Sequence, residues 1–184
     1  RTLRNSLSRL RDFEKEYGHL EFSDIDLDFA SIACDYGFKV AIIDHFTVRG
    51  IKYQSWIDLD IRPTFEERIQ DIIELKKQYH ADKILGISAG GTAAISTAYM
   101  FNGCFTVYPA LACVNQDMCR TSNVTVVTGN KDDWCPIEQA RKYSQTIGCK
   151  LVELDAQHGF LNPRQDRFMD NVYSLRKLDL PIPT

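Results

Sequence analysis

Short apolar segments of strand length alternate with amphipathic helical segments along most of this chain. The expected strands are 39–44 (KVAIID), 83–87 (KILGI), 104–109 (CFTVYP), 123–129 (NVTVVTG) and 149–155 (CKLVELD). Such mostly apolar strands are typical of parallel sheets covered on both faces, and the helices between them supply that cover. The alternation therefore predicts a single α/β domain over residues 1–184, with a mainly parallel, doubly wound sheet of about five strands.

The helical segments carry their own start and stop signals. Helices are expected at 22–38, 63–80, 89–101, 136–148 and 164–177. Thr64 and Glu67 have the spacing of a capping box at the start of the second of these helices. Gly37 and Gly148 stand where the first and fourth helices should end. Residues 1–23 are expected to form a charged, helical N-terminal segment.

Composition and charge exclude several classes of partner. The 184-residue chain has a formal net charge of −3, so it has no electrostatic footprint for nucleic acid or for an anionic membrane surface. No apolar run approaches the roughly 20 residues that a membrane-spanning helix needs. We therefore expect a small-molecule partner, while the sequence does not indicate an oligomeric state.

The six cysteines show no CxxC pair and no spacing typical of a metal site, and no metal or organic cofactor is expected. Taken mostly as free thiols, they favour a reducing, cytoplasmic compartment. Cys113 and Cys119 flank a short loop, and a disulfide between them would instead favour a periplasmic or secreted protein.

Three polar side chains follow three of the expected strands. Ser88 follows KILGI, Asp132 follows NVTVVTG, and His158 follows CKLVELD. Because ligands of open α/β sheets bind beyond the carboxyl ends of the strands, these loops are expected to meet. A serine hydroxyl needs a base to take its proton and a carboxylate to orient that base. The set predicts a nucleophilic site of Ser88, His158 and Asp132, with Asp133 as the alternative acid.

The residues around Ser88 fit a sharp strand-to-helix turn. Gly86 and Gly90 are the small neighbours that such a turn needs, and the next helix would direct its first N–H groups at a developing oxyanion. Ala89 N–H is the expected first donor. Gly86 to Thr92 also resembles a phosphate-binding loop but lacks the lysine of such a loop. A nucleotide-binding domain is therefore kept only as an alternative.

Four further side chains are candidates for substrate binding. Trp134, Tyr108 and Phe160 each adjoin a motif loop, although aromatic residues there fit a core equally well. Arg49 follows the expected strand at 39–44, and its guanidinium fork matches a substrate carboxylate. A salt bridge that fixes its own loop is the alternative that we prefer for Arg49.

The motifs resemble the dienelactone hydrolase branch of the α/β-hydrolase superfamily over roughly residues 29–168. GISAGG is similar to the nucleophile elbow of that branch, TGNKDDWCP to its acid loop, and AQHGF to its histidine loop; ACDYGFKVAIIDHFTVRG and VYP are also similar to it. The resemblance implies Ser88 as nucleophile, His158 as general base and Asp132 as acid. Dienelactone hydrolase itself uses cysteine at the elbow, so serine here implies hydrolysis of a general ester, lactone or thioester.

The resemblance also implies a segment that residues 1–23 do not supply. The superfamily has a central strand before the helix expected at 22–38, and that strand ends in a His-Gly-type loop that donates the second oxyanion N–H. Because residues 1–23 contain no run of four apolar residues, we expect N-terminal strands to be absent or replaced and the chain to lack an N-terminal piece. A catalytically impaired relic that serves as a binding or interaction module is therefore the alternative to a serine hydrolase.

Overall fold

The computed structural model describes part of the chain, namely residues 30–31, 33–51, 63–114 and 123–160. The chain divides into two compact units, residues 1–67 and 68–184, and each is described by itself. The helices expected at 1–23 and 164–177 lie outside the described residues, and so does the Cys113–Cys119 disulfide, because those side chains are not described. The single-domain expectation stays a prediction.

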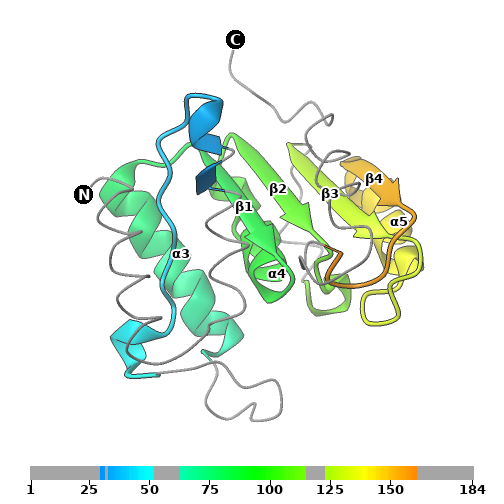
Figure 1. Cartoon of the computed structure of the whole chain (residues 1–184), viewed down its shortest axis with the longest axis horizontal. Helices are drawn as coiled ribbons and strands as arrows, with labels where there is room; N and C mark the ends of the chain where they lie inside the picture. Colours follow the sequence, from blue (N-terminus) through cyan, green and yellow to red (C-terminus); the bar gives the residue numbers. More distant parts are fainter. Residues whose placement is uncertain (1–29, 32, 52–62, 115–122, 161–184) are drawn as a thin grey trace. The chain divides into compact units, whose positions relative to one another are not determined.

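The second unit contains a parallel sheet of four strands in the order β1-β2-β3-β4 (Figure 1). The strands are β1 (Lys83–Ile87), β2 (Gly103–Val107), β3 (Val124–Gly129) and β4 (Lys150–Leu154). In the register of the sheet, Leu85 stands opposite Phe105, and Phe105 stands opposite Thr125. Because all four strands run in one direction, the loops that follow them leave from the same edge of the sheet. The predicted α/β class with a parallel sheet is confirmed.

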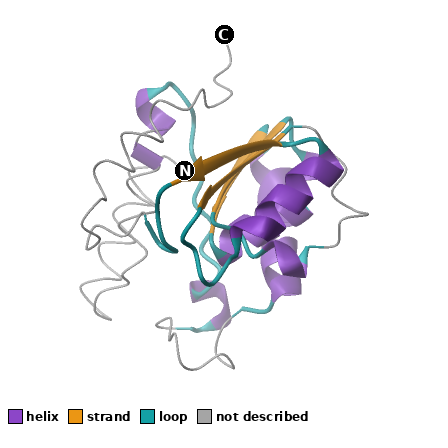
Figure 2. Cartoon of the chain, turned by 90° about the vertical axis from the view of Figure 1, so that its right-hand side faces the viewer, coloured by secondary structure: helices purple, strands orange, loops and turns teal. Residues whose placement is uncertain are grey.

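Helices connect the strands and cover the sheet. α4 (Ala89–Ser96) lies between β1 and β2 in the chain and packs on both, and α5 (Ile137–Ile147) has the same relation to β3 and β4. Figure 2 shows the strands as a twisted layer beside the helices. No helix among the described residues is long and apolar enough to cross a membrane. These connections place the carboxyl end of each strand directly before a loop or a helix start.

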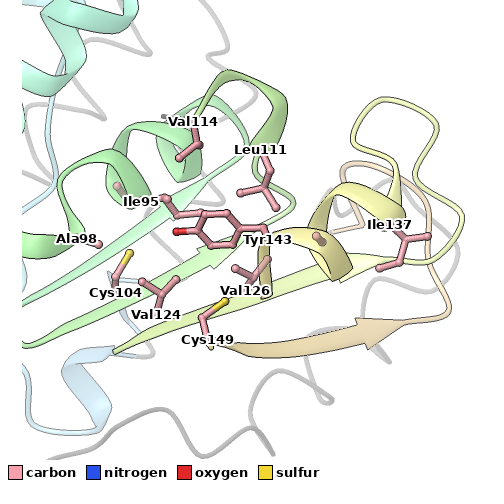
Figure 3. Close-up of a cluster of buried hydrophobic side chains, with 12 residues drawn as sticks. Ile95, Ala98, Cys104, Leu111, Val114, Val124, Val126, Ile137, Tyr143 and Cys149 are labelled. Carbon is pink, nitrogen blue, oxygen red and sulfur yellow. The ribbon is translucent and has the colours of Figure 1, made fainter. Parts of the chain in front are cut away.

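An apolar core lies between the helices and the sheet (Figure 3). Tyr143 of α5 is fully buried at its centre. The cluster consists of Ala94, Ile95, Ala98, Cys104, Leu111, Val114, Val124, Val126, Ile137, Ala140, Tyr143 and Cys149. Burial raises the pKa of the Cys149 thiol, so this cysteine stays neutral and packs as a small hydrophobic residue. The core thus joins β2 and β3 to both helices and holds the strand ends in place.

The expected cap residues bound two helices. Before α3 (Phe65–Tyr79), Thr64 N–H donates to Glu67 Oε2 at 2.7 Å, and Glu67 N–H donates to Thr64 Oγ1 at 3.2 Å. The bond from Thr64 N–H and the guanidinium of Arg49 hold the pKa of the Glu67 carboxyl below its usual range. At its C-terminal end, helix α5 stops at Gly148, which has a left-handed φ of 75°. The predicted capping box and glycine stop are both confirmed.

The strand expected at 39–44 is not present among the described residues, so the sheet has four strands there and not five. The helix before it does end at Gly37, which has a φ of 85°, and Phe38 N–H donates to Ala33 O at 3.1 Å. An isolated extended segment leaves its backbone groups unpaired, and no described segment of the first unit is a strand that could pair with it. An apolar run of strand length was therefore not sufficient evidence for a strand.

The helix after β1 is shorter than its small-residue composition predicts. α4 ends at Ser96, and the 3-10 turn η3 (Ala98–Met100) follows. The buried hydroxyl of Thr97 lies 3.1 Å from both carbonyl oxygens of Ala93 and Ala94, to which it donates. Threonine hydroxyls that bond carbonyls one turn back compete with the helical hydrogen bonds. This competition explains the change of helix type at Thr97.

Replacing Glu153 with glutamine is expected to remove an acid-sensitive contribution to stability. Arg141 of α5 donates from Nε at 2.9 Å and from Nη2 at 2.6 Å to the two carboxylate oxygens of Glu153 in β4. This fork holds the pKa of Glu153 below its usual range and raises the pKa of Arg141. A carboxyl whose pKa is lowered on folding adds stability above its unfolded pKa and loses it as the pH falls through the folded value.

The Tm difference between the wild-type chain and Glu153→Gln should therefore be fully present at pH 7, begin to shrink near about pH 4, where a glutamate carboxyl ordinarily titrates, and disappear at a still lower pH. The difference should be small, because the pair is exposed to solvent. Thermal unfolding of the two chains at pH 7 and at about pH 3, below the ordinary glutamate pKa, measures this Tm difference. An equal Tm difference at the two pH values would contradict the assignment.

Candidate functional site

Ser88 lies at the sharp turn between β1 and α4. Its backbone has a φ of 52° and a ψ of −121°, a combination that is strained for a residue with a side chain. Ser88 N–H donates to Val107 O at 2.9 Å, and Ser88 O accepts from Thr92 N–H at 3.1 Å. The turn is therefore held both by β2 and by the new helix. A strained backbone between a strand and a helix is the geometry that a nucleophile elbow needs.

Gly86 makes this turn sterically possible. A Cβ at Gly86 would lie 2.3 Å from Gly90 O and 2.8 Å from the Cβ of Ala94. Gly90 was also expected to be a small neighbour that the turn needs, but a Cβ there would meet no atom within 4 Å. Gly91, which sequence reasoning did not single out, is tighter, with 3.1 Å to Gly86 O and 3.2 Å to the Cβ of Pro109. The close approach of strand and helix therefore depends on Gly86 first and Gly91 second.

Ser88, His158 and Asp132 form one chain of polar contacts. Ser88 Oγ lies 3.4 Å from His158 Nε2, and His158 Nδ1 lies 2.8 Å from Asp132 Oδ2. In the tautomer with the proton on Nδ1, the ring donates to the carboxylate and Nε2 accepts from the serine hydroxyl. The first contact is long, as is common in active sites without substrate. The arrangement can transfer the hydroxyl proton to the imidazole and stabilise the resulting imidazolium.

Asp132 is the carboxylate that reaches the imidazole, and its own turn orients it. The side chain is fully buried, and Oδ1 accepts from Trp134 N–H at 2.9 Å and from Cys135 N–H at 2.8 Å. These bonds leave Oδ2 to face His158. Asp133 is exposed. Of the two acids that the sequence left open, the geometry favours Asp132.

Gly129, the last residue of β3, lets the acid loop and the histidine loop approach each other. A Cβ on Gly129 would lie 2.1 Å from Ala156 O. Beyond the sheet, Asn130 N–H donates to Leu154 O at 2.8 Å, and Lys131 N–H donates to Ala156 O at 3.0 Å. Sequence reasoning missed this role of Gly129. A glycine at the end of an apolar strand was the available signal, because it often marks a close backbone approach.

Aromatic side chains pack around the imidazole of His158. The Tyr108 ring centroid lies 4.7 Å from that of His158, and Trp134 stacks on the imidazole at 5.3 Å with 16° between the planes. Phe160 is fully buried and meets Tyr108 edge-on at 5.0 Å. Trp134 is 71% exposed, so much of its indole is open to a ligand. The structure thus brings Tyr108 and Trp134 against the base and Phe160 against Tyr108. Tyr108 and Phe160 are both buried, as packing residues are, and a substrate-binding role for the three aromatic residues stays a prediction.

Ala89 is the first residue of α4 and directly follows Ser88. The first N–H groups of a helix have no acceptor within the helix and carry partial positive charge. Ala89 N–H is therefore suited to meet the negative charge that develops on a carbonyl oxygen when the serine attacks. Residues 1–23, which are expected to lack the strand that carries the second donor, lie outside the described residues.

Arg49 lies in the first unit, within the 3-10 turn η1 (Thr47–Arg49). Its Nε lies 3.1 Å from Glu67 Oε1, and its Nη1 donates to His45 O at 2.7 Å. These contacts join η1 to the first turn of α3. They match the salt-bridge alternative for Arg49, and a role in substrate binding stays a prediction.

One group of side chains near the base has donors that suit a metal ion. The ligand atoms of Asp132, Cys135 and His158 all lie within 4.8 Å of one another, and they form the only such group in the described part of the chain. The cysteine spacing did not indicate this group, because the thiol and the imidazole belong to different loops that only the fold brings together. The thiols of Cys34, Cys104, Cys135 and Cys149 are not in disulfides.

No family model matches the chain, and no curated protein matches it either. Among solved structures, the chain is similar to a putative hydrolase of the α/β superfamily from Xanthomonas campestris pv. campestris. The identity is 16% and the TM-score 0.53, over 82% of this chain and 90% of that chain.

Two further similar structures have TM-scores under 0.5. A predicted CIB-like hydrolase from Thermoplasma acidophilum is 23% identical with a TM-score of 0.48, over 64% of this chain and 62% of that chain. The esterase Est2 from Thermogutta terrifontis is 18% identical with a TM-score of 0.45, over 59% of each chain. The chain thus spans about three fifths of the length of these two proteins. Together with the sheet topology, the likeness to the Xanthomonas protein shows that the fold is an α/β fold of the α/β-hydrolase type.

Proposed function

We propose that this protein is a serine hydrolase that cleaves a small or medium ester, lactone or thioester through an acyl-enzyme on Ser88. The observation that carries the proposal is the contact chain from Ser88 Oγ to His158 and from His158 to the buried carboxylate of Asp132. The strained backbone of Ser88 is a second, independent support. Within the hydrolases of this fold, the motifs favour a dienelactone hydrolase-like enzyme with serine at the elbow.

In the proposed reaction, Ser88 Oγ attacks the carbonyl carbon of the substrate while His158 Nε2 takes the hydroxyl proton. The imidazolium is stabilised by Asp132 Oδ2, 2.8 Å from Nδ1. The intermediate collapses, the bond to the leaving group breaks, and His158 returns the proton to that group. A water molecule, deprotonated by the same base, then attacks the acyl carbon and releases the acid and the free serine. These steps use no metal or organic cofactor.

The residues around His158 affect the stability of the transition state and the choice of substrate. Ala89 N–H would donate to the oxyanion, and one donor of this kind is typically worth about 3 kcal/mol of transition-state stabilisation. Trp134 presents exposed apolar surface beside the imidazole, which suits an apolar acyl or leaving group.

A fluorophosphonate probe tests the proposal, because an activated serine displaces its fluoride and forms a stable oxygen–phosphorus bond. Intact-protein mass spectrometry is expected to show one adduct on the wild-type chain and none on Ser88→Ala. Ser96→Ala is the matched control, because Ser96 lies at the far end of α4, where its hydroxyl donates to Thr92 O at 3.0 Å. This control should keep the adduct. A folded wild-type chain that forms no adduct would contradict the proposal and favour a binding or interaction module.

A further inference from the structure

We propose that Asp132, Cys135 and His158 form a Zn²⁺ site whose occupation switches off the hydrolytic site. Two of these residues belong to the proposed nucleophilic site, whereas the Cys135 side chain has no part in the reaction described above. Binding of the ion is inferred from the ligand geometry alone. The inhibitory consequence rests on the proposed function.

The three side chains supply the donor types that zinc prefers, namely a carboxylate oxygen, a thiolate sulfur and an imidazole nitrogen. These atoms lie within 4.8 Å of one another. Tetrahedral zinc with bonds of about 2.0 to 2.3 Å holds neighbouring donors roughly 3.3 to 3.8 Å apart. The widest pair therefore needs to close by no more than about 1.5 Å. A thiolate ligand also selects zinc over Mg²⁺ and Ca²⁺, which prefer oxygen ligands.

One rigid turn carries two of the three donors. Asp132 Oδ1 accepts two backbone N–H groups, one of them from Cys135, and these bonds orient Oδ2 as the remaining donor atom. Ligating carboxylates are held in this way by outer hydrogen bonds. Cys135 directly precedes Pro136, whose φ is −54°, at the start of α5. Asp132 and Cys135 are both buried, so the carboxylate and the thiol are positioned before an ion arrives.

The imidazole explains why zinc and hydrolysis exclude each other. Both nitrogens of His158 already have partners, Nδ1 with Asp132 and Nε2 with Ser88. An ion on Nε2 displaces the contact with Ser88. An ion on Nδ1 moves the ring proton to Nε2, which then cannot accept the serine proton. In either case the thiol proton of Cys135 passes to solvent, and the serine loses its base.

Co²⁺ is the probe for the binding step, because its complexes with thiolate ligands absorb light where the protein alone does not. Titration of the full chain with Co²⁺ should produce a thiolate-to-cobalt band together with the intense visible bands of tetrahedral cobalt. Zn²⁺ should abolish both. Cys135→Ser should lose the thiolate band and bind Zn²⁺ at least about 100-fold more weakly, since even outer-shell changes cost ten- to a hundredfold. His158→Ala, as a second variant, should weaken Co²⁺ binding as well.

Cys34→Ser is the matched control, because Cys34 is a partly exposed free thiol of the other unit. It should keep the thiolate band. A thiolate-to-cobalt band that survives in a folded Cys135→Ser variant would overturn the metal site. This outcome does not depend on whether the proposed hydrolase function is correct.

The inhibitory step is measured by fluorophosphonate labelling of Ser88. The labelling rate of the wild-type chain should fall with Zn²⁺ over the range in which Zn²⁺ displaces Co²⁺, and Mg²⁺ at the same concentrations should leave it unchanged. In Cys135→Ser, the Zn²⁺ concentration that halves that variant's own labelling rate should rise about 100-fold. Labelling that Zn²⁺ does not slow would overturn the switch. If Ser88 is not labelled even without metal, the proposed function fails, and the Co²⁺ titration alone decides the site.

Discussion

The Asp132→Asn variant is expected to lower kcat/KM for a p-nitrophenyl ester by about 10⁴-fold, or about 5 kcal/mol of transition-state stabilisation. In the native turn, Oδ1 accepts the N–H groups of Trp134 and Cys135. The amide oxygen of asparagine will take that place, so its NH₂ group will face His158. That group donates to Nδ1, the ring proton moves to Nε2, and Nε2 can no longer accept the proton of the serine. The fold should survive, because the substitution conserves size and the two N–H bonds.

Asp133→Asn is the matched control for this variant. It removes the same charge one residue along, from an exposed side chain. Its kcat/KM is expected to stay close to that of the wild-type chain. Steady-state rates, together with circular dichroism to verify folding, distinguish the two acids. Loss of activity in Asp133→Asn, with activity kept in Asp132→Asn, would reverse the assignment.

The Gly86→Ala variant is expected to lower the free energy of unfolding by about 3 kcal/mol or more, the upper range for overpacking. The added methyl group would lie 2.3 Å from Gly90 O and 2.8 Å from the Cβ of Ala94. Backbone occupies one side of this space, so a side-chain rotation cannot relieve the clash. α4 must move away from β1, and Ser88 must move with it. Urea unfolding should show a lower midpoint, and fluorophosphonate labelling of the folded fraction should slow.

Gly90→Ala places the same methyl group in open space four residues along. No atom lies within 4 Å of the new Cβ. Alanine is favoured over glycine within a helix by about 1 kcal/mol. We expect an unchanged or slightly higher unfolding midpoint for Gly90→Ala. Equal destabilisation by the two substitutions would show that the contact between strand and helix at Gly86 is not the cause.

Local signals in the sequence were sufficient for most of the elements. The segment 83–87 was predicted as a strand and is β1 with the same bounds. The capping box at Thr64 and Glu67 and the glycine stop at Gly148 were also predicted, because each acts over a few neighbouring residues. The prediction of a strand at 39–44 was wrong, because a strand depends on contacts beyond its own neighbouring residues. A strand exists only with a partner, and an apolar run does not reveal whether a partner is present.

The sequence by itself determined the alternation of strands and helices, and with it the prediction that Ser88, Asp132 and His158 leave the same edge of a parallel sheet. Periodicity and turn chemistry carry that information, because they act within a few residues. Only the tertiary structure decided that the carboxylate of Asp132 faces the imidazole, that Gly86 and Gly129 permit the close approaches, and that the Cys135 thiol lies beside the base. These features depend on distances between loops that are far apart in the chain, and packing of the helices on the sheet sets those distances.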